Sequence, residues 1–206
     1  MSPQLKIISD DDLREILAQH ALWLKESGKQ GKQADLQNFS LKGKDLRKAD
    51  LRFANLEGAD LFCADLSDAD LRDANLRGVH LHSANLGGAN LSHADLSGFN
   101  LSGMNFRDAT LDHARLFKTD LRNTDFTNAN LYGAYLWDAN LKGAKLQGAT
   151  LDFAWIARTN LRRAYIAASW VTAQKSVEKA ILGPFQRLRL VTLGWPRGNN
   201  DKVTPG

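Results

Sequence analysis

One five-residue phrase repeats without interruption through most of this chain. It is plainest at 64–78, which reads Ala-Asp-Leu-Ser-Asp, Ala-Asp-Leu-Arg-Asp, Ala-Asn-Leu-Arg-Gly. If the leucine is position i, it recurs every five residues from Leu36 to Ile166, giving 27 repeats with no shift of frame. Position i is leucine in 23 repeats, position i−2 is alanine in 19, and position i−1 is aspartate or asparagine in 18. A repeat this regular defines the architecture of the chain.

A period of five residues fits neither an α-helix nor an alternating β-strand. It suits a chain that turns a corner every five residues, with i−2 and i pointing inward and the other three positions pointing to solvent. Stacked coils would then bury columns of alanine and leucine. Aspartate and asparagine at i−1 suit the corners because their short side chains bond to nearby backbone groups. Glycine, frequent at i+2, fits the same corners.

The pattern Ala-(Asp/Asn)-Leu-x-x resembles that of the pentapeptide-repeat family. The resemblance covers 34–168 and implies an all-β solenoid, a right-handed quadrilateral β-helix with four repeats per coil. On that fold the 27 repeats would make about seven coils, and the rod would be roughly 30 Å long at strand spacing. We expect three parts: an N-terminal capping helix and connector at 1–33, the β-helix at 34–168, and a C-terminal cap and tail at 169–206.

A helix is predicted before the repeats, at about 10–27. Ser9 followed by Asp12 resembles a capping box, and Gly28 ends the apolar periodicity. This helix is expected to cover the open end of the first coil, as terminal elements of solenoids do, although it could instead bind a partner. His20 lies on its apolar face and is expected to pack in the core. Lys44 falls at an inward position, which predicts a distorted first coil rather than a buried charge.

The repeat decays after Ala168, and a short C-terminal helix is predicted from Thr172 to the Gly183-Pro184 pair. The apolar and basic stretch 185–196 would suit a second cap, a homodimer contact or an interfacial anchor, and 197–206 is expected to be disordered. The segment 169–206 has six basic and two acidic residues, whereas 34–168 has sixteen of each. The net charge of +4 therefore lies entirely in the tail.

Outward residues of the C-terminal half form the candidate contact surface. On one face the polar residues of the early coils give way to aromatic and arginine side chains: Arg115, Phe117, Tyr135, Trp137 and Trp155. The neighbouring face stacks four basic side chains: Arg122, Lys142, Arg162 and Arg163. Tryptophan, tyrosine and arginine dominate interface hot spots, and an exposed apolar patch needs a cover. The cover is either a partner protein or the C-terminal tail of the chain itself.

All eight exceptions to alanine at i−2 lie in two of the four columns. Phe99, Met104 and the i residue Phe106 are near neighbours, so we expect an enlarged core in the middle of the rod. This prediction concerns packing alone.

No site for catalysis, a cofactor or a metal is predicted. His93 and His113 lie one coil apart and could share a metal in principle, but no third ligand lies beside them, whereas bound zinc takes three or four. Carboxylates occur at every corner by construction, so their pairing is no sign of acid–base chemistry. No phosphate loop, nucleophile elbow or zinc signature is present. Cys63 is the only cysteine, which excludes an internal disulfide.

The chain shows no secretory signal at 1–9 and no run of 18 apolar residues, so a cytoplasmic protein without a membrane span is expected. The resemblance implies two functions: a scaffold that binds another protein, as proposed for bacterial members, or a DNA mimic that binds DNA gyrase or another type II topoisomerase. Mimicry requires a surface dense in negative charge, and here the rod is neutral and its frame unbroken. Direct nucleic-acid binding has only the basic column and tail to support it. We interpret the chain as a non-enzymatic protein-interaction module with a partner of unknown identity.

Overall fold

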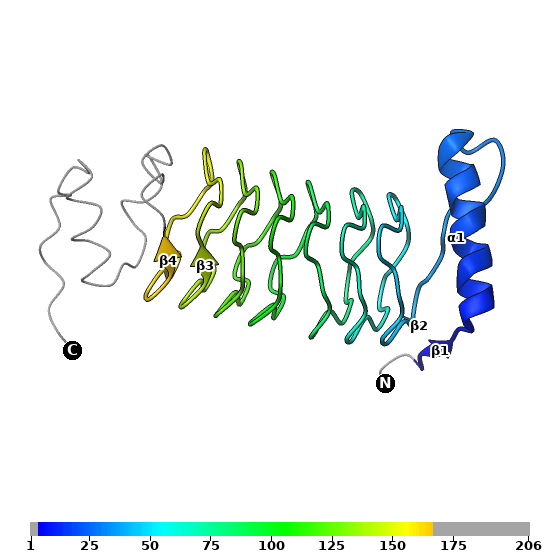
Figure 1. Cartoon of the computed structure of the whole chain (residues 1–206), viewed down its shortest axis with the longest axis horizontal. Coiled ribbons are helices and arrows are strands. Elements are labelled where there is room, and N and C mark those ends of the chain that lie inside the picture. Colours follow the sequence, from blue (N-terminus) through cyan, green and yellow to red (C-terminus); the bar gives the residue numbers. More distant parts are fainter. Residues whose placement is uncertain (1–3, 167–206) are drawn as a thin grey trace, which may run out of the picture.

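The computed structural model describes residues 4–166, which form a stack of coils with one helix beside its N-terminal end (Figure 1). Two short parallel pairs mark the ends of the stack. Strand β1 (Lys6–Ile7) pairs with β2 (Phe39–Ser40), and β3 (Lys145–Leu146) pairs with β4 (Tyr165–Ile166). The predicted C-terminal helix and tail lie outside the described residues.

Each coil takes 20 residues, because parallel bridges join positions that are 20 apart, as in Asp35 with Asn55 and Tyr135 with Trp155. We number the coils from 34–53 as coil 1, so that 134–153 is coil 6 and coil 7 begins at Ala154. A typical step has two backbone bonds: the Leu116 amide donates to Tyr135 O at 2.8 Å, and the Tyr135 amide donates to Ala114 O at 2.9 Å. The hydrogen bonds of one coil thus go to its neighbours, as in other solenoids.

The corners have the chemistry that the repeat predicts. The i−1 carboxylate or amide accepts the backbone N–H two residues on, as Asp95 does from Ser97 at 3.1 Å. The i+2 residue has positive φ, 69° at Gly88, where an added Cβ would lie 2.2 Å from Asp68 Oδ1 in the coil below. Larger residues also adopt this conformation, including Phe153 at 60°. Residues at i+2 therefore project outward from an edge of the rod.

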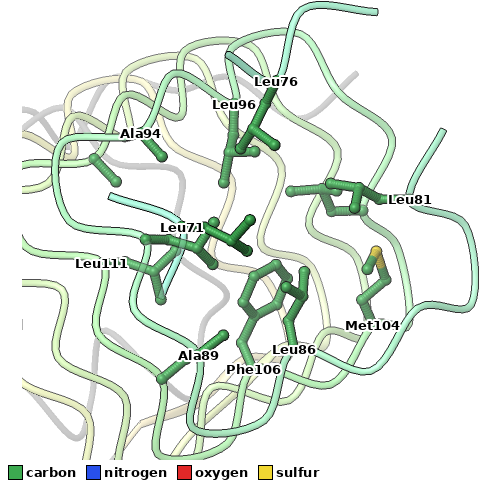
Figure 2. Packing of buried hydrophobic residues seen from close by; sticks show 14 of the residues in the cluster. Leu71, Leu76, Leu81, Leu86, Ala89, Ala94, Leu96, Met104, Phe106 and Leu111 are labelled. Carbon is green, nitrogen blue, oxygen red and sulfur yellow. The ribbon is translucent and has the colours of Figure 1, made fainter. Parts of the chain in front are cut away.

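The interior is a continuous apolar core made by positions i and i−2, as predicted, and Figure 2 shows leucines and Phe106 converging within it. Phe106 stacks on Phe126 with ring centroids 5.3 Å apart. Buried threonines replace alanine in the later coils, and each donates its hydroxyl to a backbone carbonyl, as Thr124 does to Leu101 O at 3.0 Å. These hydroxyls are buried without leaving a polar group unpaired.

The predicted helix is present as α1 (Asp10–Lys25), two residues shorter than expected, with Ser9 as its N-cap accepting from the Asp12 amide at 3.0 Å. Leu13 and His20 are its buried residues. His20 Nδ1 accepts the Ala34 amide at 3.1 Å, and burial lowers the pKa of its imidazole. The helix is thereby joined to the first residue of coil 1.

Two features of the N-terminal end differ from the sequence predictions. Coil 1 is regular, with Asp35, Asp45 and Asp50 all bridged to coil 2, so the predicted distortion at Lys44 is wrong. The Lys44 side chain instead extends to the Asp10 carboxylate in the first turn of α1. The sequence reading also did not anticipate β1, whose two residues add a bridge beneath coil 1.

Candidate functional site

The five residues predicted on one face of the C-terminal half lie together on the outside of the rod. We call them the aromatic surface: Arg115, Phe117, Tyr135, Trp137 and Trp155. Trp155 is 61% exposed and Trp137 is 49% exposed, whereas Phe117 and Tyr135 are half-buried. The two tryptophans are thus outward residues and not part of the core.

Ring contacts connect most of this surface. Tyr135 stands between Phe117 and Trp155, with ring centroids 5.8 Å and 6.3 Å away. The Arg115 guanidinium lies 5.6 Å from the Phe117 ring, and its Nε is 3.6 Å from Asp95 in coil 4. Such stacking fixes the side chains in advance, which lowers the entropic cost of binding. Trp137 has no ring contact among the described residues.

The aromatic surface replaces a local hydrogen bond of the fold. Where i−1 is aspartate or asparagine, its side chain accepts the i+1 amide, but Arg115, Tyr135 and Trp155 have no acceptor to offer there. In the described part of the chain, the amides of Phe117 and Trp137 accordingly have no protein acceptor. A hydrogen bond of this kind stabilises a protein by about 1 kcal/mol. These positions therefore depart from the repeat at the expense of stability, as functional sites do.

The predicted basic column is present but only partly free. Arg122 forms a two-pronged ion pair with Asp120 at 2.6–2.9 Å, which raises the pKa of its guanidinium. Lys142, Arg162 and Arg163 are exposed, and no ion pair within 4–166 involves them. Three of the four basic side chains thus remain available to an acidic group.

A second aromatic run, which the sequence analysis did not find, lies around the edge from the first. His93 stacks on His113 at 5.4 Å, Tyr132 meets His113 edge-on at 5.6 Å, and Phe153 meets Tyr132 at 5.3 Å. Phe153 is 72% exposed and is separated from Trp155 by one residue. Comparing equal positions in successive coils missed this run, because Tyr132 is at i+1 and Phe153 at i+2. A diagonal comparison would have found it.

The two histidines that were considered as a metal site belong to this aromatic run. The rings of His93 and His113 are parallel within 2°. Among the described residues there is no cluster of three or more histidine, cysteine, aspartate or glutamate side chains able to hold a metal ion. Cys63 is exposed and free. No helix among these residues has the length and apolarity to cross a membrane.

The repeats match the family of pentapeptide repeats in eight copies, over 32–62, 59–98, 84–123 and 124–163. The chain therefore belongs to the pentapeptide-repeat family. Proteins of this family fold as right-handed quadrilateral β-helices. Comparison with curated protein sequences gives no match.

Several similar proteins with solved structures are described as pentapeptide-repeat proteins. One from the Arabidopsis thaliana thylakoid lumen is 25% identical, with 56% of this chain and 82% of that chain covered and a TM-score of 0.44. HetL from the cyanobacterium Nostoc, involved in regulating heterocyst differentiation, is 29% identical over 66% of this chain and 73% of its own, with a TM-score of 0.30. QnrB1, a plasmid-mediated fluoroquinolone resistance protein, is 17% identical over 79% and 90%, with a TM-score of 0.30.

Proposed function

We propose that this protein is a non-enzymatic interaction module that binds a partner protein through the aromatic surface. The observation that carries the proposal is the group of aromatic side chains exposed on one face, of which Tyr135 and Trp155 stand where the repeat calls for aspartate or asparagine. Trp137 and Trp155 would be the anchors, because large exposed rings on a rigid support yield much binding energy for little lost entropy. Tyr132 and Phe153 extend the same apolar region around the edge.

The free basic side chains define the kind of partner. Lys142, Arg162 and Arg163 border the aromatic surface on the next face and have no ion pair among the described residues. Complementary charge around an apolar centre steers association and sets orientation. We therefore expect the partner to present an apolar patch with acidic groups beside it.

The charges of the rod give no support to the alternative, a DNA mimic that binds topoisomerase. Within 4–166, four aspartates pair with an arginine two residues on, and they include Asp50 and Asp70 at 2.7 Å and 2.6 Å. Arg47 holds the pKa of Asp45 to about 2 through the same kind of hydrogen bond. A surface of paired charges presents few of the regularly spaced negative charges that a DNA-binding channel recognises.

We also assign α1 to the rod as its N-terminal cap, and not to a partner. Its apolar residue Leu13 is buried with Ile8 and Leu36 in the cluster that fills the coils. An uncapped coil would expose both apolar side chains and unpaired backbone.

Affinity capture with the full chain tests the proposed interface. The double variant Trp137→Asp/Trp155→Asp should lose a partner that the unaltered chain captures from lysate of the source organism. Arg77→Asp, on the same face in coil 3, is the matched control and should retain it. Circular dichroism must first show that both variants are folded. Equal capture by the double variant would contradict the proposal and leave the C-terminal tail as the cover of the aromatic surface.

A further inference from the structure

The ladder between coils is interrupted at one place, between coil 3 (74–93) and coil 4 (94–113). The bridges that would join Asn75 to Asp95 and His80 to Asn100 are absent from the described residues. The same four residues are bridged on their other sides, for example His80 to Asp60. On these two sides, six amides have no backbone acceptor within 4–166, and they belong to Leu76, Gly78, Leu81, Ser83, Asp95 and Asn100; the Asn105 amide, on the next side, also has none.

The other two sides of the same step are closed. The Leu86 amide donates to Asn105 O at 3.1 Å, and the Leu91 amide donates to Thr110 O at 2.7 Å. A Cβ added to Gly98, at a corner on the open side, would meet no atom within 4 Å, whereas one on Gly78, which stacks on Gly58 in coil 2, would lie 3.9 Å from the Gly58 backbone. The two coils are therefore separated on two adjacent faces and joined on the remaining two.

The separation has a cause in the sequence. Val79 and Phe99 stand one above the other at the inward position i−2, which is alanine in most repeats. The preceding residue of the column is Ala59, so this is the first step of the column at which two side chains larger than alanine follow one another. Phe99 remains partly buried while its neighbours in the core are buried. Overpacking of this kind is relieved by movement of the backbone.

A cavity of about 650 Å³ lies at the opening. The backbone at Gly78–Leu81 and Ser97–Asn100 lines the cavity together with outward side chains of coils 1–3. The side chains that matter for recognition are Lys42, Asp60, Phe62, His80, His82 and Phe99. This volume is within the range of ligand sites, which is a few hundred to about 1,000 Å³. We call this site the coil 3–4 cleft.

The chemistry of the cleft is that of a peptide site. Both rims present backbone groups without partners, and these include donors (the amides of Leu81 and Asn100) and an acceptor (the carbonyl of Val79). An anion would require donors alone, whereas another peptide backbone requires both. Lys42 Nζ is 3.2 Å from Asp60, so the cleft carries no unbalanced charge.

The aromatic side chains indicate what the peptide must carry. Phe62 and His82 stack at 6.0 Å, and Phe62 is 43% exposed at the rim. We propose that the coil 3–4 cleft binds an extended peptide segment with an aromatic side chain, in which the backbone pairs with the open rims and the ring packs on Phe62. Peptides that add to an open sheet edge are recognised in this way. The site is independent of the aromatic surface.

Amide signals of the ¹⁵N-labelled full chain provide the test. The probe is an acetylated peptide of alternating threonine and valine with phenylalanine at its centre, and the control peptide has glutamate there. The phenylalanine peptide should shift the signals of Leu76, Gly78, Leu81 and Asn100 and slow their hydrogen exchange by roughly tenfold or more at saturation. The glutamate peptide should bind more weakly. Absence of these changes, or equal binding of the two peptides, would overturn the proposal.

N-acetylphenylalanine amide separates a peptide site from a small-molecule site. If it shifts the same signals as strongly as the peptide while leaving exchange fast, the cleft is a small-molecule pocket and the proposal fails.

Two variants locate the binding. Phe62→Ala removes an exposed ring and should weaken the peptide by at least roughly fivefold, whereas Phe153→Ala, an equal change on the aromatic run, should have no effect. The reverse result would place the peptide on the aromatic run and refute the cleft. Phe99→Ala, which restores the usual alanine, should close the ladder and abolish binding; if it does not fold, Phe62→Ala still decides.

Discussion

Coils 1–3 and coils 4–7 share an interior and differ in what they present at the outward i−1 position. In the first half, the i−1 residue of one face is an aspartate or asparagine that holds the corner, as Asn55 does by accepting the Glu57 amide at 3.3 Å. In the second half, on one face, Arg115, Tyr135 and Trp155 take that position and give up the corner bond. The difference shows that the outward residues of this fold can vary independently of the inward residues that form its core. The inward positions maintain the coil, and the outward ones can change without disturbing it.

The largest effect concerns the shared interior. Leu56 in coil 2 and Leu136 in coil 6 occupy the same face and are fully buried. Replacing either with alanine should lower the free energy of unfolding by about 2–5 kcal/mol, because each leaves a cavity between two coils. Urea unfolding of the two variants should give nearly equal losses. A loss confined to one variant would break the comparison, since the two halves would then differ inside as well.

An exchange of i−1 residues should produce a smaller effect of opposite sign in the two halves. Tyr135→Asn restores an acceptor for the Trp137 amide and should stabilise the chain by about 1 kcal/mol. Asn55→Tyr removes the bonds of Asn55 to the Glu57 amide at 3.3 Å and to Asp35 at 2.9 Å, and should destabilise it by a similar amount. Thermal unfolding measures both. If Tyr135→Asn is destabilising, ring stacking outweighs the corner bond and the aromatic residues are structural.

The third effect is a loss of stability at low pH that concerns the N-terminal end alone. It is absent near neutral pH and grows as the pH falls. Burial lowers the pKa of His20, so the unfolded chain takes up a proton more readily than the folded one. Its contribution to stability is complete above the unfolded pKa of about 6.5 and is lost as the pH drops below it. The loss should be visible in hydrogen exchange of the Ala34 amide and absent in His20→Gln. An equal loss in that variant would assign the pH dependence to other groups.

The sequence predicted the fold well because the repeat specifies it many times over. Leu66 or Ala69 says little alone, but 27 similar phrases in one frame leave few alternatives. The outward direction of Trp137 and Trp155 followed from the same frame. The aromatic run of Tyr132 and Phe153 did not, because contact between different positions of neighbouring coils depends on the angle at which each side chain leaves the corner.

Local deviations were harder to predict. Lys44 was expected to distort coil 1, yet a long side chain can leave an inward position and find a carboxylate on another element, which no count of positions reveals. Phe99 was expected to enlarge the core. The sequence does not show whether two large inward side chains are accommodated by repacking of the core or by movement of the backbone. In the structure, the backbone hydrogen bonds of the Leu81 and Asn100 amides are lost.

The period of 20 residues has an evolutionary consequence. If a single phrase were gained or lost between α1 and coil 5, every later residue would keep its inward or outward direction, and Tyr135 would still stack on Trp155. The aromatic surface would nevertheless move by a quarter turn around the axis relative to α1. Because four repeats make one full coil, the number of repeats before coil 5 determines on which of the four sides of the rod, relative to α1, a partner would bind. A lineage could redirect that side by unequal recombination while leaving every pairwise contact of the interface intact.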